Sequence, residues 1–134
     1  MYLTWEYKKQ YNLNKLFEEA NGTKEGTSFV NMLSYLKHEG LIKNYALVHT
    51  EQSLKTAIYL NGPCVAGLPV RDAESSRFWI GNKIEGYHAV SVIGWDNNGF
   101  ILQNSWGSSW GNYGRAVLPY TDFRYFKEIW TLIK

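Results

Sequence analysis

The stretch GYHAVSVIGWDNNGFILQNSWGSSWGNYG, from Gly86 to Gly114, decides the fold of this chain. It predicts an apolar strand, a tight turn at Asp96 to Gly99, and a second strand, because Asp, Asn and Gly tolerate the backbone angles of hairpin turns. His88 lies near the start of the first strand and Asn104 ends the second, so a hairpin brings both to the same end of the sheet. An imidazole beside a carboxamide is the orienting half of a nucleophilic apparatus, in which a partner holds the base in one tautomer.

Two motifs in this stretch resemble the second half of a papain-like cysteine peptidase. The histidine segment of that family reads roughly G-x-H-A-V, and residues 86–90 read GYHAV. The asparagine segment reads N-S-W-G-x-x-W-G-x-x-G, and residues 104–114 match every keyed position with NSWGSSWGNYG. The order of the two motifs and the distance between them also fit the family.

The resemblance implies roles for individual residues. His88 would pair with a cysteine thiolate and later protonate the leaving amine, Asn104 would fix the orientation of the imidazole, and Trp106 would shield their hydrogen bond from water. The family also implies substrate-binding roles for Gly67, Tyr87 and Ala89. At the strand position of Gly67 the family lines a pocket for the second residue of the substrate, and a glycine there predicts a wide pocket or none.

The nucleophile that this family uses is not found in the sequence. The family carries it as a Cys at the start of a long helix, in a C-G-x-C-W-like context with a Gln shortly before, and that segment is expected upstream of these residues. The only cysteine is Cys64, in NGPCVA at 61–66, which resembles a strand entry where the family has an apolar residue. A reactive thiol needs an electropositive, partly open setting. We therefore expect Cys64 to be buried and slow to react.

Three functional hypotheses remain open. The favoured hypothesis is an inactive pseudo-peptidase that serves as a binding or structural module of a larger assembly, such as a phage or other virus particle. The chain could instead be the carboxy-terminal part of an active cysteine peptidase whose Cys comes from another chain or a missing segment. A third hypothesis is a regulator or inhibitor of a peptidase. Each implies a peptide or protein as the partner, and whether the chain is an enzyme stays uncertain, although we expect no turnover from the chain alone.

The composition excludes several other classes of function. With 134 residues, a net charge of +2 and no run of Lys or Arg, the chain has no natural affinity for nucleic acid. Its longest apolar runs fall short of the ~20 residues that cross a membrane. The three scattered histidines and single cysteine predict neither a metal site nor a cofactor. Without a visible signal peptide or paired cysteines, a cytoplasmic or virion-associated protein of bacterial or phage type is favoured over a secreted one.

The predicted fold class is α+β, papain-like, with helices followed by an antiparallel barrel-like sheet. We expect one domain over 1–134, truncated relative to the family because the Cys-bearing helix is absent, with 1–60 mainly helical and 61–134 mainly β. Predicted helices cover Met1 to Phe17, Ser28 to Gly40 and a segment capped by Thr50, whose buried positions are Leu54, Ala57, Ile58 and Leu60. Predicted strands outside the hairpin are Cys64 to Val70, Arg115 to Pro119 and Trp130 to Ile133, and Leu41 to Val48 is predicted to be a connector.

Overall fold

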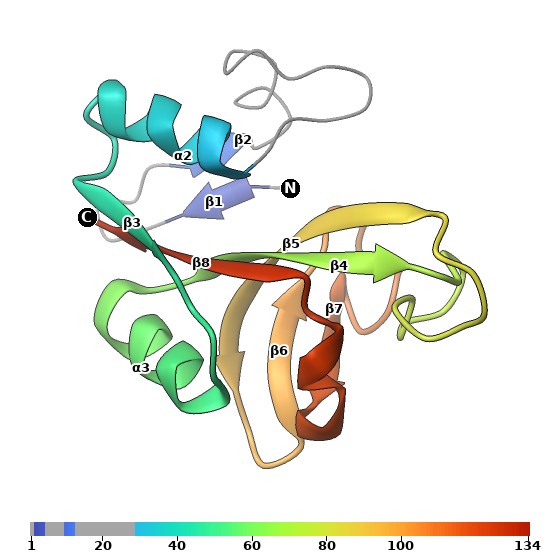
Figure 1. The fold of residues 1–134 in the computed structure, drawn as a ribbon. Helices are drawn as coiled ribbons and strands as arrows, with labels where there is room; N and C mark the ends of the chain where they lie inside the picture. Colours follow the sequence, from blue (N-terminus) through green and yellow to red (C-terminus); the bar gives the residue numbers. More distant parts are fainter. Residues whose placement is uncertain (1, 5–9, 13–28) are drawn as a thin grey trace.

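The computed structural model describes residues 2–4, 10–12 and 29–134 (Figure 1). Two short strands, β1 (Tyr2–Thr4) and β2 (Gln10–Asn12), pair in antiparallel fashion. The other elements are α2 (Phe29–His38), β3 (Asn44–Leu47), α3 (Glu51–Asn61), β4 (Cys64–Val70), β5 (Gly86–Trp95), β6 (Gly99–Gln103), β7 (Arg115–Pro119), the 3-10 helix η1 (Tyr120–Tyr125) and β8 (Glu128–Ile133).

The first predicted helix is wrong wherever it can be compared with the structure. Tyr2–Thr4 and Gln10–Asn12 are strands, and the rest of Met1 to Phe17 lies outside the described residues. Each of the two strands contains a tyrosine, Tyr2 and Tyr11, and tyrosine is favoured in strands. The predicted division at residue 60, and the truncated single domain, stay predictions.

Six strands form one antiparallel sheet in the order β3-β8-β4-β5-β6-β7. β3 and β7 are its edges and, among the described strands, do not pair with each other, so the predicted barrel-like sheet is curved but open (Figure 1). The predicted hairpin is the β5–β6 pair, in which Ser91 lies opposite Gln103. A β-bulge between Val92 and Gly94 increases the local bend of the long strand β5.

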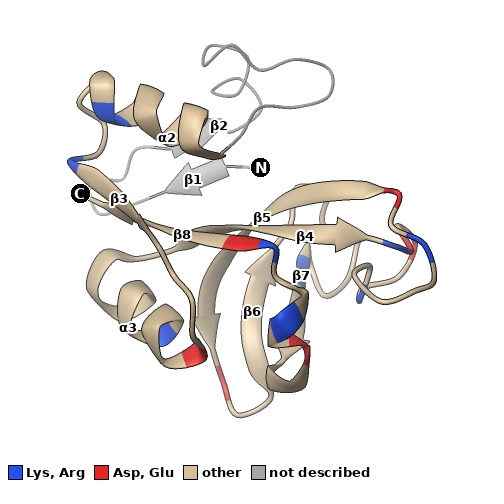
Figure 2. Cartoon of the chain, viewed as in Figure 1, with Lys and Arg blue, Asp and Glu red and all other residues tan. Residues whose placement is uncertain are grey.

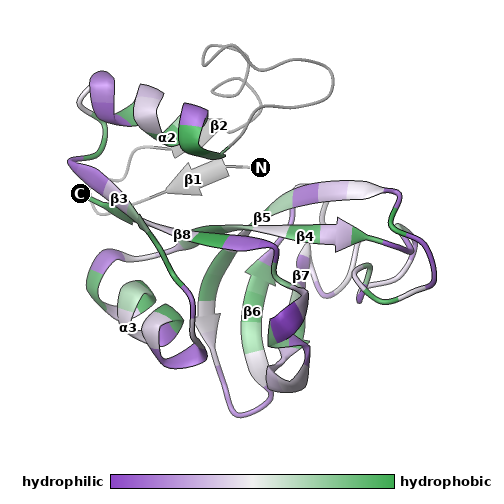
Figure 3. Cartoon of the chain, in the orientation of Figure 1, coloured by the Kyte–Doolittle hydropathy of each residue, from purple (hydrophilic) through white to green (hydrophobic). Residues whose placement is uncertain are grey.

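The two helices cover opposite faces of the sheet. Along β4, side chains alternate between the faces, so Cys64, Ala66 and Leu68 join the core under α3 while Val65 joins the core under α2. Figure 1 shows α2 and α3 on either side of the strands β3, β8 and β4. β4 is buried along almost its whole length, which explains why its sequence is a continuous apolar run rather than an alternating one. Figure 3 shows green along parts of β4 and β8.

The helix ends follow local chemistry that the sequence contains. Gly40, just beyond α2, has a φ of 75°, the left-handed conformation that ends many helices. The Thr50 side chain accepts a hydrogen bond from the Ser53 backbone at 3.0 Å and so caps α3. The prediction that Leu60 is buried is wrong, because Leu60 is 69% exposed. The buried stripe of α3 is set by Leu54 and Ala57, and Leu60 lies off it.

The predicted connector Leu41 to Val48 contains a strand. β3 pairs with β8 from Asn44 opposite Ile133 to Leu47 opposite Trp130. Most β3 side chains are exposed, so an edge strand of this kind shows no alternation of apolar and polar residues. β8 also begins two residues before the predicted closing strand, at Glu128.

Acidic and basic residues are interspersed along the turns and element ends of the described chain, as Figure 2 shows. In the part that the structure describes, no helix has the length and hydropathy needed to cross a membrane.

Candidate active site

The hairpin brings His88 of β5 and Asn104, which follows β6, into direct contact. His88 Nε2 lies 2.6 Å from Asn104 Oδ1. The turn that joins the strands is built by Asp96, whose carboxylate accepts hydrogen bonds from the backbone N–H groups of Asn98 at 2.7 Å and Gly99 at 3.2 Å. The predicted juxtaposition of the imidazole and the carboxamide is therefore confirmed.

The hydrogen bonds around Asn104 identify which imidazole nitrogen carries the proton. The Ser105 backbone N–H can only donate, and it points at Asn104 Oδ1 from 2.7 Å. That atom is therefore the amide oxygen, which accepts from both Ser105 and His88. His88 must then donate from Nε2–H, which leaves Nδ1 without a proton in the neutral ring. Nδ1 is the nitrogen that can act as a base.

Two aromatic rings contact the imidazole of His88. The indole of Trp106 stacks on the imidazole, with ring centroids 4.6 Å apart and an interplanar angle of 22°. Phe78 meets the imidazole edge-on, with ring centroids 5.9 Å apart. The Phe78 ring is tilted against Trp106, with centroids 4.9 Å apart. This removal of water lowers the pKa of His88 below its ordinary value, against the opposing effect of the hydrogen bond to Asn104. His88 is thus held neutral, as a base, at pH 7.

The loop after Asn104 is held in place by its backbone. Asn104 donates its N–H to Gly114 O at 2.9 Å, and Gly114 donates to Trp110 O at 2.8 Å. Gly111 has a φ of 56°, and a Cβ there would lie 2.5 Å from Arg115 O. The glycines of this motif therefore serve the close return of the chain that supports Asn104.

Cys64 is not brought to His88. Its side chain is fully buried, as predicted, and it lies opposite Val92 on β5, whereas His88 lies opposite Leu68. Four residues at about 3.3 Å each separate the two along the strand, or roughly 13 Å. Burial raises the pKa of the thiol to about 11, although a hydrogen bond with Thr131 acts in the opposite direction. Its slow reaction with thiol reagents stays a prediction.

The three residues proposed for substrate binding lie close to His88 along the sheet. Gly67 pairs with Ala89 on β5 and with Glu128 on β8. A Cβ on Gly67 would meet the ring of Phe29 at 3.3 Å, so this ring occupies the space next to the glycine. Ala89 and Phe29 are both partly buried and pack against the core under α2.

Tyr87 is 55% exposed beside His88, and Lys127 Nζ lies 4.0 Å from the centre of its ring. The roles of Gly67, Tyr87 and Ala89 in binding stay predictions.

Sequence reasoning missed the residues behind His88. Phe78 and Trp79 are fully buried although they belong to the irregular segment between β4 and β5. Asp122 in η1 is also buried and binds Trp79. The one available signal was an aromatic pair within an otherwise polar loop. The two other histidines, His38 and His49, are exposed. In the described part of the chain, no group of three or more His, Cys, Asp or Glu side chains could hold a metal ion.

Comparisons with known proteins agree with the motifs. The sequence profile described as "Papain family cysteine protease" matches residues 4–120. Among curated proteins, a viral cathepsin of Heliothis zea nuclear polyhedrosis virus is 36% identical over 74 residues, which cover 50% of this chain and 20% of the virus protein. The cathepsin B-like cysteine proteinase 1 of Haemonchus contortus is 32% identical over 79 residues, covering 52% and 23% respectively.

Solved structures show the same fold. Xylellain, a cysteine protease from Xylella fastidiosa, has a TM-score of 0.53 and 25% identity over 69% of this chain and 40% of its own. A Carica candamarcensis cysteine protease, solved in complex with E-64, has a TM-score of 0.53 and 20% identity over 69% of this chain and 49% of its own. The chain thus spans about a fifth to a quarter of the length of the curated relatives named here and less than half of each of these solved chains.

Proposed function

The chain belongs to the papain family of cysteine proteases, and we propose that it supplies the base half of a peptide-hydrolysing active site whose thiolate comes from outside these 134 residues. The observation that carries the proposal is the 2.6 Å hydrogen bond between His88 Nε2 and Asn104 Oδ1, which leaves Nδ1 as the basic nitrogen. A peptide or protein is the corresponding substrate.

The proposed chemistry uses Nδ1 of His88 twice. Nδ1 takes the proton of the incoming thiol, and the resulting thiolate attacks the carbonyl carbon of the peptide. The imidazolium then donates that proton to the leaving amine, as the C–N bond breaks and a thioester forms. A water molecule, deprotonated by Nδ1, hydrolyses the thioester and releases the thiol. Throughout, Asn104 Oδ1 accepts from Nε2–H, so the ring keeps one orientation while its charge changes.

Cys64 is a poor candidate for this thiol. It is buried, lies roughly 13 Å along the sheet from His88, and has a pKa of about 11, so almost no thiolate forms at neutral pH. Without a thiolate, His88 offers only general-base help to water, which contributes roughly 10²–10⁴-fold. Enzymes typically reach 10⁶-fold or more. The chain alone should therefore show no peptidase turnover.

A second candidate function is a binding module that holds a peptide or protein without cleaving it. The position of Cys64 favours it, since this chain's own thiol is far from its base. In this case the module would act within a larger assembly, such as a virus particle, or would regulate an authentic peptidase.

Hydrolysis of a panel of fluorogenic peptides distinguishes the two candidates. The chain is assayed alone, joined to any coding sequence that precedes it, and together with the proteins encoded beside it, and His88→Ala is assayed in parallel. His49→Ala is the matched control, because His49 is exposed and lies outside the hairpin and loop that form the site. The proposal expects turnover only in the extended or combined samples, lost in His88→Ala and kept in His49→Ala. The added segment or partner should carry a Cys at a helix start and a Gln shortly before it.

Other outcomes separate the alternatives. Peptide binding without turnover in every combination would favour the binding module and contradict the proposal. Turnover by the chain alone that disappears in His88→Ala would contradict both candidates, because it would require a nucleophile within these residues.

A further inference from the structure

We propose that Asp122 is a positioning residue for His88 and acts through the neighbouring residues Trp79 and Phe78. The inference rests on the proposed function of His88 as the base. Asp122 lies in η1, far from the β5–β6 hairpin in sequence, and nothing in the two motifs includes it.

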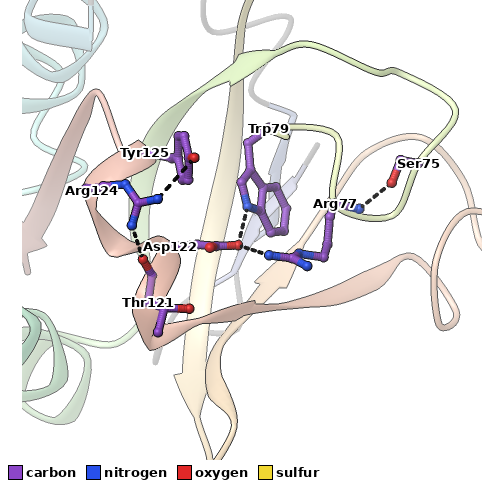
Figure 4. A network of polar contacts seen from close by, with 7 residues as sticks. All are labelled: Ser75, Arg77, Trp79, Thr121, Asp122, Arg124 and Tyr125. Atoms are coloured by element: carbon purple, nitrogen blue, oxygen red, sulfur yellow. Dashed lines mark hydrogen bonds and ion pairs between the residues drawn. The ribbon is translucent and has the colours of Figure 1, made fainter. Parts of the chain in front are cut away.

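The carboxylate of Asp122 fixes the loop between β4 and β5 from one side. Its Oδ2 accepts hydrogen bonds from Trp79 Nε1 at 2.9 Å and from the Arg77 guanidinium at 2.6 Å (Figure 4). Only 5% of Asp122 is exposed. Burial opposes its ionisation, but the hydrogen bonds from Trp79 and Arg77 and the charges of Arg77 and Arg124 outweigh it and lower the pKa below its usual range. A buried, paired carboxylate of this kind holds both donors in a defined place.

The backbone fixes the same loop from the other side. Phe78 O accepts hydrogen bonds from the N–H groups of Arg71 at 2.8 Å and Asp72 at 3.0 Å. The loop has no regular secondary structure of its own, and a segment of this length has many alternative conformations unless it is tied down. Phe78 and Trp79 are fully buried. The hydrogen bonds of Asp122 to Trp79 and Arg77, and the two backbone bonds to Phe78 O, hold them in this position.

Phe78 connects Trp79 to the imidazole of His88 through ring contacts. Its ring meets Trp79 at 5.2 Å, His88 at 5.9 Å and Trp106 at 4.9 Å, measured between centroids. Trp106 in turn stacks on His88. If the hydrogen bond between Trp79 and Asp122 is lost, Trp79 no longer holds the Phe78 ring in place. The indole of Trp106 and the imidazole of His88 can then move and become more exposed to water. The position and the dryness of His88 therefore depend on a carboxylate that does not touch it.

Two variants test this chain of contacts. Trp79→Phe removes the N–H that binds Asp122 but leaves the Arg77 ion pair, so the fold should survive. Asp122→Asn removes the negative charge that binds Arg77 and Trp79. Arg124→Lys is the matched control, because it alters the hydrogen bonds to Thr121 O and Tyr125 within the same 3-10 helix but keeps the positive charge near Asp122 and does not touch Trp79 (Figure 4).

The readout is the NMR titration of the His88 ring in the full chain, which needs no partner and no peptide hydrolysis. We expect the pKa of His88 to rise toward its ordinary value of about 6.5 in both test variants. The ring resonances should also lose part of the upfield shift that the stacked Trp106 imposes, and Arg124→Lys should match the wild type. A folded Trp79→Phe protein with unchanged His88 pKa and resonances would overturn the proposal, even if its melting temperature fell. Because the titration is independent of turnover, failure here and failure of the proposed function are separate results.

Discussion

Asn104→Ala removes the acceptor that orients His88, and its cost can be worked out from the contacts. Asn104 Oδ1 accepts from His88 Nε2 at 2.6 Å and from the Ser105 N–H at 2.7 Å. Asn104 Nδ2 has no hydrogen-bond partner within the described residues, so its removal loses no bond. Ser105 is exposed, and water can replace its acceptor. The main loss is therefore the bond to the half-buried imidazole.

A hydrogen bond of this kind contributes about 0.5–1.5 kcal/mol net, and a buried donor left unpaired costs about 1–3 kcal/mol. Because His88 is only half buried, we expect Asn104→Ala to reduce the free energy of unfolding by about 2 kcal/mol. For a domain of this size, that is a fall in Tm of roughly 6–10 °C. The pKa of His88 should also fall further, because the bond to Asn104 is what raises it.

Urea unfolding followed by tryptophan fluorescence measures the first effect, and NMR titration of His88 measures the second. Asn112→Ala is the control, since Asn112 is an exposed asparagine in the same loop. Asn104→Asp keeps an acceptor oxygen and adds a negative charge, so it should raise the pKa of His88 above the wild-type value. If Asn104→Ala unfolds within about 0.5 kcal/mol of the wild type, the range of an ordinary surface change, or if the pKa of His88 does not fall, the assigned hydrogen bond is wrong.

Three further predictions concern Gly111 and Asp122, which support the site, and the buried thiol of Cys64. Gly111→Ala should destabilise the fold by about 2 kcal/mol or more in a denaturant titration, because φ is positive and the new Cβ would meet Arg115 O; an unchanged midpoint would contradict this backbone path. Asp122→Asn should reduce the free energy of unfolding at pH 7. The wild-type carboxyl has a lowered pKa, so its contribution is present above about pH 4 and is lost as the pH falls through that lowered pKa; the difference between the two proteins should therefore shrink in acid, and a constant difference would exclude the charge as its cause. Cys64 should resist iodoacetamide under native conditions and become labile in denaturant, and rapid native labelling by an electrophilic peptide would revive it as a nucleophile.

Much of the framework follows from local sequence. The strands Cys64–Val70 and Arg115–Pro119 begin and end where the sequence predicts, because proline, glycine and apolar runs mark their limits. The turn at Asp96 and the cap at Thr50 are equally local, since each side chain binds the backbone two or three residues away. The contact between His88 and Asn104 follows once the hairpin is accepted.

The surroundings of His88 depend instead on contacts that no local pattern encodes. Asp122 and Trp79 meet across 43 positions of sequence, and they do so because η1 packs beside the loop before β5. The proton on Nε2 follows only from the direction of the Ser105 N–H. β3 escaped prediction because its exposed side chains show no alternation, and only the pairing with β8 makes it a strand.

The ¹⁵N spectrum of the His88 ring at neutral pH tests the central claim most directly. Nδ1 and Nε2 have distinct shifts that report which nitrogen carries a proton. We expect a neutral ring with the proton on Nε2 and none on Nδ1, because Asn104 Oδ1 accepts from Nε2 and burial lowers the pKa. A proton on Nδ1 of the neutral ring, or a ring still charged at pH 7, would contradict the assignment of His88 as a base presented through Nδ1.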